Sequence, residues 1–394
     1  MSADTYTEVT SQGWFSRIGG AIKGILVGLI LVAGGAALLW FNEGRAVKTA
    51  KALKEGAGVV VSVGADRVEP GNEGRLVHMT GQATTGEQLA DPDFGVSANA
   101  IALRRSVEMF QWKESKHSET KKKLGGGEET VTTYTYDKAW SREAISTSDF
   151  KKPEGHGNPG SFPFTEETWR ASRVTLGAFT LSEGLLAQMT DFQPLPMTST
   201  AGVKLPAGRF GGMQISGGLL FLGANPSSPQ VGDMRVSFAQ IRPGMVSVVA
   251  RQVASSFEPY LTTVGRSLEM LEPGAVSADA MFKSAMASNR MLTWILRAVG
   301  FVLIFIGFAA VFKPLSVLAD VVPFIGNLVG FGTGAVAFML ALFVSLVVIA
   351  IAWIVYRPVL GIGLLVVAVG TAVFLLSRRK KPAGVPQPPP LPGA

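Results

Sequence analysis

Residues Trp294–Leu376 read WILRAVGFVLIFIGFAAVFKPLSVLADVVPFIGNLVGFGTGAVAFMLALFVSLVVIAIAWIVYRPVLGIGLLVVAVGTAVFLL, and this stretch decides the fold class. It is almost continuously apolar and is interrupted mainly by Lys313–Pro314, Asp320, Pro323 and Arg357–Pro358. A helix needs roughly 20 apolar residues to cross about 30 Å of hydrocarbon, so the stretch has room for about three crossings. The chain is therefore an integral membrane protein.

A fourth apolar run, residues 24–41, lies alone near the N-terminus, and the polar segment between the two apolar regions cannot lie in lipid. We expect an integral membrane α-helical protein with one N-terminal and three C-terminal transmembrane helices and a large β-rich α+β extramembrane domain. The predicted order is a cytoplasmic N-terminal segment 1–23, transmembrane helix 1 24–41, the β-rich domain 42–289, helix 2 290–312, an apolar connector 313–332, helix 3 333–356, helix 4 358–376, and a basic, Pro-rich cytoplasmic tail 377–394.

The composition excludes several classes of site. The 394 residues contain no cysteine, which rules out disulfides, thiolate metal sites and cysteine nucleophiles. The three histidines, His78, His117 and His156, are too widely separated for a metal site on one helix. We therefore expect no cofactor and no metal.

The net charge of +7 does not indicate nucleic-acid binding, because of where the basic residues lie. Many of them gather in Lys121–Lys123, Lys151–Lys152 and the cluster Arg378, Arg379, Lys380 and Lys381, which directly follows helix 4. These groups are typical of solvated loops and topology determinants, and the last cluster is also placed to contact anionic headgroups.

The flanks of the apolar runs predict the orientation. Trp14, Arg17 and Lys23 precede helix 1, and no small-x-small cleavage pattern follows Trp40, so we interpret this helix as a signal-anchor. Four crossings place both termini on one side, together with Lys313. The basic residues make that side cytoplasmic, and the large domain periplasmic, extracellular or lumenal.

Further arginines lie near the predicted interfaces. Arg297 is one turn inside helix 2, and Arg357 separates helices 3 and 4. A long side chain at such a depth snorkels to the headgroups, so we place both with Trp14 and Arg17 at the lipid interface. The alternative, a role in an ion path, is disfavoured because the cores of the predicted helices carry no acidic residue or histidine.

Glycines recur every four residues in two places. Gly20, Gly24 and Gly28 lie in and before helix 1, and Gly326, Gly330 and Gly334 lie in the connector and helix 3. Small residues at this spacing let another helix approach closely. Two interpretations remain open: packing within one helical bundle, and self-association into a homo-oligomer.

The connector is too apolar for an ordinary loop, yet it contains Asp320, Pro323 and several glycines. A re-entrant element and a short amphipathic helix in the interface both fit this composition.

The large domain is predicted to be mainly β. Val131–Tyr136 alternates with period two, and similar runs predict strands at 58–63, 75–82, 101–112, 130–140, 171–179, 234–240 and 246–252. The patterns also predict helices at 43–56, 182–189 and 278–288. Loops are expected at 114–127, as an exposed hairpin tip or mobile connection, and at 151–164.

No catalytic motif is present. The carboxylates Glu166, Glu167, Asp233 and Glu258 are expected to form salt bridges or solvated faces. The tail contains Pro388-Pro-Pro-Leu-Pro, which favours polyproline II, the conformation that SH3 and WW domains bind, although a tail without a partner is the simpler interpretation.

Several short motifs resemble one family when they are taken in order. They are Trp40-Phe-Asn-Glu-Gly-Arg-Ala-Val47, Glu108-Met-Phe-Gln-Trp112, Tyr134-Thr-Tyr-Asp-Lys-Ala-Trp140, Gly232-Asp-Met-Arg-Val-Ser-Phe238, Thr293-Trp-Ile-Leu-Arg-Ala-Val-Gly300 and Ala352-Trp-Ile-Val-Tyr-Arg-Pro358. The set, with its one-plus-three layout, resembles the transmembrane protein 43 family, also called LUMA.

The resemblance implies a four-span protein with its large domain in the lumen. Animal members of that family are associated with the inner nuclear membrane and endoplasmic reticulum, are linked to emerin and lamins, and self-associate; prokaryotic members also exist, to which nuclear partners do not transfer. The family has no established catalytic residues.

The expected function is that of a non-enzymatic, self-associating membrane scaffold that contacts membrane lipids and other membrane proteins. The alternative is a channel or lipid-handling protein that uses the connector 315–332. A membrane-tethered hydrolase would need carboxylates or a serine and its base to converge in one pocket.

Overall fold

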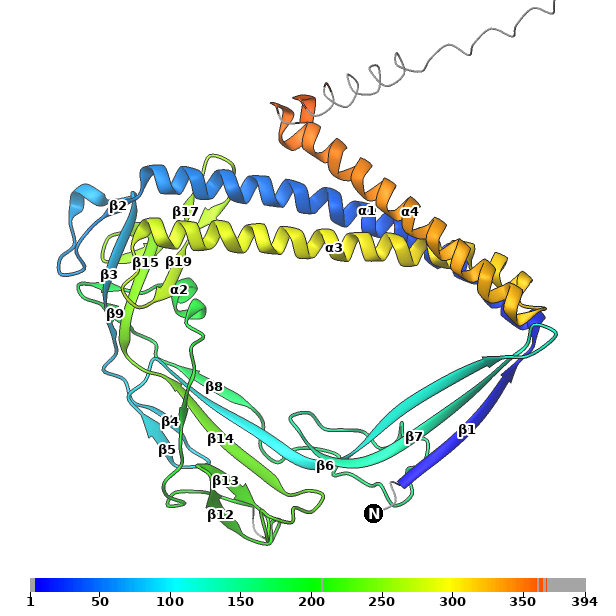
Figure 1. Cartoon of the computed structure of the whole chain (residues 1–394). Helices are drawn as coiled ribbons and strands as arrows, with labels where there is room; N and C mark the ends of the chain where they lie inside the picture. The colour runs from blue at the N-terminus through cyan, green and yellow to red at the C-terminus, as the bar shows by residue number, and fades with distance from the viewer. Residues whose placement is uncertain (1–3, 207, 360, 364–365, 367–394) are drawn as a thin grey trace, which may run out of the picture. The chain divides into compact units, whose positions relative to one another are not determined.

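The structure is a computed structural model that describes residues 4–359 except 207, together with 361–363 and 366 (Figure 1). Its helices are α1 (Trp14–Val59), α2 (Glu183–Gln188), α3 (Ala278–Ala319) and α4 (Pro323–Tyr356), with a 3-10 turn at Pro70–Asn72. Its strands are β1 (Asp4–Gln12), β2 (Val61–Ser62), β3 (Leu76–Thr84), β4 (Leu89–Asp91), β5 (Val96–Ala98), β6 (Ala102–Lys122), β7 (Glu128–Ser141), β8 (Glu167–Arg170), β9 (Thr175–Leu176), β10 (Phe179–Thr180), β11 (Gln193–Leu195), β12 (Met213–Ser216), β13 (Leu219–Leu222), β14 (Met234–Ile241), β15 (Gly244–Val253), β16 (Ser256–Glu258), β17 (Tyr260–Leu261), β18 (Ser267–Leu268) and β19 (Met270–Pro273).

Within the described ranges, three helices are long and apolar enough to cross a membrane: α1, α3 and α4. This confirms the predicted class, a helical membrane protein with a large β-rich domain, with three candidate spans in place of four. The fourth predicted helix, 358–376, lies largely outside the residues that the structure describes. Helix α1 continues to Val59, which confirms the helical segment predicted after helix 1.

The helices α3 and α4 extend further into the connector 313–332 than the sequence predicts, and the re-entrant or interfacial position of this segment stays a prediction. The sequence predicts a re-entrant or interfacial element at 313–332, between helices 2 and 3, but α3 runs on to Ala319 and α4 begins at Pro323. Lys313 and Pro314 do not end α3, although the Pro314 ring removes one backbone hydrogen bond inside the helix. The connection is therefore a three-residue corner, Asp320–Val322, between two long helices.

Contacts divide the chain into two compact units. The first contains the segment up to Gly20, residues Lys48–Asn289 and residues Leu315–Gly330; the second contains Ala21–Val47, Arg290–Pro314 and the chain from Phe331 onward. The first unit holds the two large sheets, and the second holds the apolar middle parts of the long helices.

The larger sheet of the first unit has the order β1-β7-β6-β14-β13-β12, and neighbouring strands in it are antiparallel. Strand β6 has 21 residues: its first part pairs with β14, and the rest pairs with β7 from Met109–Ser141 to Lys122–Glu128. Strand β1 pairs with β7 over nine residues, from Asp4–Tyr136 to Gln12–Glu128. Together β1, β7 and the second part of β6 form a three-stranded ribbon, which we call the ribbon (Figure 1).

The ribbon differs from the sequence prediction in two ways. The loop expected at 114–127 is strand as far as Lys122, so the hairpin turn contains only the five residues 123–127. The N-terminal segment, for which the sequence predicts no strand, forms β1. Threonine-rich alternation, as in Asp4–Gln12, suits a strand exposed on both faces but carries no apolar signal.

The second sheet has the order β10-β9-β3-β15-β16 and packs on α2. Helix α2 begins at the predicted place because the Ser182 hydroxyl accepts a hydrogen bond from Leu185 N. The strand predicted at 171–179 is reduced to Thr175–Leu176. The end of α1 and the start of α3 pack on this sheet in a separate apolar cluster, which contains Leu53 and Phe282 together with Leu76 of β3 and Val249 of β15.

The pairing of β1 with β7 predicts a disulfide cross-link. Thr7 and Thr133 lie opposite each other, and opposed residues in antiparallel strands have Cα atoms about 4.5–5.5 Å apart, within disulfide range. We expect the double variant Thr7→Cys/Thr133→Cys to form a disulfide on mild oxidation in membranes, as measured by a mobility shift that is reversed by reductant. The natural chain has no cysteine, so no background bond interferes.

The matched control is Thr7→Cys/Glu129→Cys, in which the second cysteine is displaced by four residues, roughly 13 Å along β7. It should not cross-link. Equal yields from the two pairs would show that β1 does not hold this register.

Candidate functional site

Asp320 is the centre of a buried ion cluster in the first unit, which we call the corner cluster. Its side chain is 1% exposed and forms ion pairs with Arg17 and with Lys122, the latter at 2.6 Å between Lys122 Nζ and Asp320 Oδ1. Arg17 also pairs with Glu128 at 2.6 Å and donates a hydrogen bond to the Gly126 carbonyl. The cluster therefore joins the start of α1, the hairpin turn of the ribbon and the corner between α3 and α4.

The local sequence explains why Asp320 is buried. Asp320 is the C-cap of α3, and its backbone N–H donates to the Val317 carbonyl. A Cβ at Gly326 would lie 1.8 Å from Asp320 Oδ1, so only glycine leaves room for the carboxylate at this position. Pro323 begins α4, where the missing N–H of proline carries no cost. The end of α3, Pro323 and Gly326 thus leave the space that the Asp320 carboxylate occupies.

The hairpin turn is shaped to reach the corner. Gly125 and Gly126 have φ angles of 85° and 81°, which are strained for other residues. Gly125 N donates to the Val321 carbonyl at 3.1 Å, and a Cβ at Gly126 would collide with the Trp14 ring. The Trp14 indole in turn donates to the Val317 carbonyl at 2.8 Å. Backbone and side-chain contacts hold the turn against the corner.

Charges decide the ionisation of Asp320. Burial by itself raises the pKa of its carboxyl, but hydrogen bonds from Lys122 and Arg17 outweigh burial and hold that pKa below its ordinary value of 3.8. Asp320 therefore carries its charge at neutral pH, and its two partners balance it.

A second set of ion pairs fastens β1 at its other end. Asp4 pairs with Lys152 at 3.2 Å and with His156 at 3.0 Å, and Glu8 pairs with Lys151 at 3.0 Å. The hydrogen bonds from Lys152 and Lys151 lower the pKa of Asp4 and of Glu8, respectively. The loop predicted at 151–164 supplies these three partners.

The aromatic side chains beneath this loop support it. Tyr136 stacks on His156 with ring centroids 4.1 Å apart. Burial, followed by a hydrogen bond to Glu114, raises the pKa of Tyr136 to about 12, so its hydroxyl stays protonated. That hydroxyl donates to Glu114 and accepts from Lys152 N. The ribbon is thus held at both ends.

The second unit has its own buried pair, formed by Glu43 of α1 and Arg297 of α3. The Glu43 side chain is fully buried, and the two side chains make a two-pronged contact with N···O distances of 2.6 and 2.9 Å. Trp353 of α4 donates its indole N–H to Glu43 at 2.8 Å, and the Arg297 guanidinium lies over the Trp294 ring. The three helices meet at one carboxylate.

The arginines predicted to lie at the lipid interface have partners within the protein. The Arg357 guanidinium lies 5.9 Å from the centroid of the Trp353 ring. Arg17 is 8% exposed in the corner cluster, and Arg297 is paired with Glu43. The basic cluster at the end of helix 4 lies outside the described residues; its members are Arg378, Arg379, Lys380 and Lys381.

The glycines of α1 contact α3 with a spacing of seven residues. Gly28 lies against Gly307, where a Cβ on either glycine would be 2.6 Å from the carbonyl oxygen of the other. Gly35 approaches Gly300 and Ile304 in the same way. Because these helices belong to the same chain, the contact is packing within one bundle.

The other predicted glycines divide into two groups. A Cβ added at Gly20, Gly24 or Gly334 would meet no atom of another residue within 4 Å, whereas one added at Gly326 or Gly330 would meet Asp320 or Ser316. The structure thus brings Gly326 and Gly330 to the end of α3, and leaves Gly20, Gly24 and Gly334 open.

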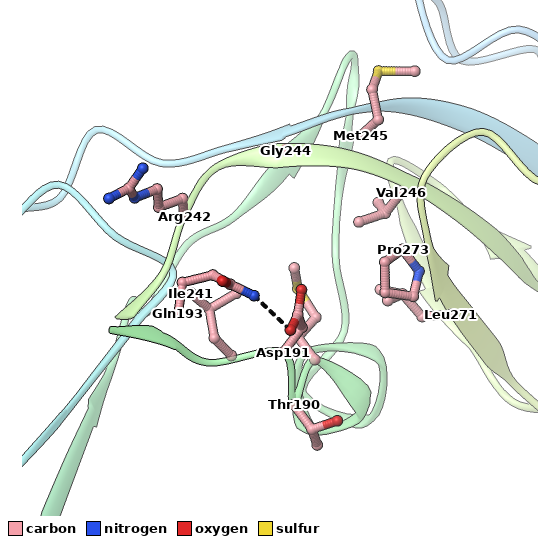
Figure 2. A pocket seen from close by; sticks show the side chains of 11 residues that line it. Thr190, Asp191, Gln193, Ile241, Arg242, Gly244, Met245, Val246, Leu271 and Pro273 are labelled. Atoms are coloured by element: carbon pink, nitrogen blue, oxygen red, sulfur yellow. Dashed lines mark hydrogen bonds between the residues drawn. The ribbon is translucent and has the colours of Figure 1, made fainter. Parts of the chain in front are cut away.

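A cleft of the first unit lies between the segment that follows α2, β15 and β19, and has a volume of about 160 Å³ (Figure 2). Asp191 accepts a hydrogen bond from Gln193 at 2.7 Å, while Arg242 points away from Asp191. The rest of the lining includes Met189, Val246 and Leu271. This volume is below that of ordinary small-molecule sites, and no nucleophile and base converge among the residues that line the cleft.

The carboxylates considered from the sequence lie apart. Glu167 pairs with Arg105, Glu258 pairs with Arg251, and Asp233 accepts from Gln230 N. Over the part of the chain that the structure describes, no three His, Asp or Glu side chains are placed to hold a metal ion.

The sequence patterns do not predict the roles of Glu43, Lys122 and the pair Gly300 and Gly307. From the sequence, Glu43 is expected at the polar end of the first apolar run, and Lys122 is expected in a solvated loop. The glycine signal is present as a spacing of seven, shared by Gly28–Gly35 and Gly300–Gly307, which a spacing of four does not reveal.

Comparison with known proteins gives one consistent result. A family profile described as Transmembrane protein 43 matches residues 109–358. Transmembrane protein 43 of Rattus norvegicus is 36% identical over 91% of this chain and 91% of its own length, and that of Homo sapiens is 34% identical over 95% and 94%. The Drosophila melanogaster homolog is 32% identical over 89% and 93%. No solved structure matches.

The buried pair in the second unit predicts an asymmetric effect of mutation. Glu43→Ala leaves Arg297 buried without its counter-charge, so we expect a loss of about 3–5 kcal/mol of unfolding free energy, measured by denaturation in lipid nanodiscs. Replacing both residues, Glu43→Met/Arg297→Met, should recover most of that loss. As a control, Lys283→Met breaks the exposed pair with Asp279 and should cost less than about 1 kcal/mol. A Glu43→Ala effect no larger than the control would contradict the burial of this pair.

The corner cluster predicts a pH-dependent effect. Asp320→Asn removes the charge between Lys122 and Arg17, and we expect it to cost about 3 kcal/mol at pH 7. Because the pKa of Asp320 is lowered, its contribution is complete above the ordinary value of 3.8 and is lost as the pH falls through the lowered pKa. The difference in melting temperature between wild type and Asp320→Asn should therefore stay constant from about pH 5 to 8 and shrink below about pH 4.

The control on the same hairpin is Glu129→Gln, which removes only the partly exposed pair with Lys123. Its melting temperature should stay close to that of wild type at every pH. A difference for Asp320→Asn that grows on acidification would contradict the assignment.

Proposed function

Because the chain belongs to the transmembrane protein 43 family, we propose that it is a non-enzymatic multi-pass membrane scaffold that self-associates and organises other membrane proteins through its large domain. We propose an extracytoplasmic place for that domain: periplasmic or extracellular in a prokaryote, and lumenal in a eukaryote. Its partners are membrane lipids, further copies of the chain and other membrane proteins, without a cofactor.

The ribbon is the observation that carries the proposal. Its 21-residue strand β6 would extend roughly 70 Å if fully regular. The side chains of β1 are almost all exposed, as are those of β6 from Ser115 to Lys121. Among the strands of the described residues β1 is the last at this end of the sheet, so none of them pairs with its outer edge. The ribbon, which is long and exposed and has an open strand edge, is suited to binding other proteins.

The pairing of the buried charges also favours a structural role. Asp320 and Glu43 are both buried, and each is paired with a cationic side chain of the same chain. A catalytic acid would need access to a substrate. These clusters stabilise the fold.

The alternative function, a channel or lipid-handling protein that uses residues 315–332, would need Asp320 to face a water-filled path. In the structure, Asp320 is 1% exposed and ion-paired, which favours the scaffold. Ion flux in liposomes that is lost in Asp320→Asn would favour the channel instead.

Self-association is tested by two glycines on the same helix. Gly24 is open, so Gly24→Leu should shift the protein in native-lipid nanodiscs from oligomer toward monomer, as measured by mass photometry and cross-linking. Gly28 packs against Gly307, so Gly28→Leu should lower the melting temperature of the protein more than Gly24→Leu does. A wild-type chain that stays monomeric in native lipid and captures no partner would overturn the scaffold proposal.

A further inference from the structure

We propose that His156 controls, through its protonation, the attachment of the N-terminal end of β1 to the ribbon: the imidazolium form holds Asp4, and loss of one proton from the ring releases it. The device is a pH-sensitive contact within the first unit. It acts inside one copy of the chain and does not depend on the scaffold proposal.

Both ring nitrogens of His156 face oxygen atoms that can only accept a hydrogen bond. Nδ1 lies 2.8 Å from the Lys152 carbonyl oxygen, and Nε2 lies 3.0 Å from Asp4 Oδ2. The pKa of Asp4 is lowered, chiefly by the hydrogen bond from the Lys152 side chain, so its carboxylate is ionised and has no proton to donate. Both nitrogens of the ring must therefore donate. Neutral imidazole has only one donor, so this geometry requires the imidazolium ion.

The two sides of the contact differ in their freedom to move. The His156 side chain is 2% exposed: Tyr136 stacks on it with ring centroids 4.1 Å apart, and Trp112 meets it at an angle of 85°. The Asp4 side chain is 44% exposed, so its carboxylate can turn to water. A neutral ring therefore keeps its bond to the Lys152 carbonyl in the same loop and loses Asp4.

The charged side chains around the ring come from four segments, and they are Asp4 of β1, Glu114 of β6, Lys138 of β7 and Lys152 of the loop. Glu114 accepts the Tyr136 hydroxyl at 2.7 Å, and Lys138 Nζ lies 4.6 Å from the centroid of the Trp112 ring. Two of these groups are acidic and two are basic. Among the side chains of the site, only histidine ordinarily changes charge between about pH 5 and 8.

The released part of β1 is its first half. Asp4 and Tyr136 form the first pair between β1 and β7, whereas Glu8, four residues further on, is held by Lys151. Loss of the His156 contact therefore frees residues 4–7 and leaves the rest of the strand in place. It uncovers residues 133–136 of β7, so the protonation of His156 decides which strand forms the edge of the sheet at this end.

The first test follows β1 in the full-length protein in lipid nanodiscs. A nitroxide on Thr5→Cys reports on the released end, because Thr5 is exposed and its side chain lies on the face of the strand opposite to that of Asp4. A hydrogen bond between charged groups changes an equilibrium by roughly tenfold or more. We expect the ratio of mobile to immobile nitroxide to rise about tenfold from about pH 5.5 to about pH 8.5. A ratio that stays constant or falls would overturn the proposal.

Two variants separate protonation from packing. His156→Gln places its one nitrogen at only one of the two acceptors, so the ratio at about pH 5.5 should already equal that of the wild type at about pH 8.5. Asp4→Asn should stay immobile at both pH values, because an amide accepts from the imidazolium and donates to the neutral ring. The matched control is His117→Gln, which removes a histidine of the same ribbon that is 81% exposed and should behave like the wild type. Wild-type pH dependence in His156→Gln or in Asp4→Asn would contradict the assignment.

A second measurement needs no substitution at the site. The chain has only three histidines, so nitrogen-15 spectra of histidine-labelled protein resolve His156, whose signals are identified by their loss in His156→Gln. Its nitrogens should change from two protonated to one over the same pH interval in which the nitroxide on Thr5→Cys becomes mobile. A nitroxide on Ser11→Cys, near the other end of β1, should stay immobile throughout. Mobility that appears while both nitrogens remain protonated, or that appears equally at Ser11→Cys, would show that His156 does not control this end of the strand.

Discussion

One carboxylate, that of Asp320, constrains the arrangement of the first unit. It lies between a helix end, a hairpin turn and the beginning of another helix, and it binds cations from two different segments. Removing such a charge from water is costly, and the cost is recovered only when several partners are held in place together. The glycine at 326 and the positive φ angles of Gly125 and Gly126 are the conditions under which those partners reach it. Much of the local sequence here is explained by this one group.

The second unit also contains a buried carboxylate, that of Glu43, but its charge is balanced by a different set of partners. Glu43 and Arg297 neutralise each other, and Trp353 completes the hydrogen bonds of the carboxylate. Close glycine contacts between α1 and α3 bring the helices near enough for short side chains and carbonyl oxygens to touch. Packing and one ion pair together hold three helices, since the hydrophobic effect does not act between helices in lipid.

The sequence predicts the features that depend on hydrophobic periodicity and on the length of the apolar runs. The apolar runs, the extension of helix 1 beyond the membrane, the start of α2 at Ser182 and several central strands follow from pattern alone. Contacts between segments that are far apart in the chain cannot be predicted from these patterns. Nothing in the threonine-rich Asp4–Gln12 indicates that it pairs with β7, because its strand has no apolar face. Lys122 looks like any solvated lysine until the hairpin brings it to Asp320, and Pro314 suggests a helix end that tertiary packing overrides.

The pairing of β1 with β7 also has a consequence for biosynthesis. Thr10 and its partner Thr130 are 120 residues apart in the chain. At a synthesis rate of about 5–20 residues per second, β7 is synthesised roughly 6–24 s after β1. The native pairing of β1 cannot form during that interval. Because β1 precedes β7 in the chain, this edge of the sheet is completed only after β7 has been synthesised.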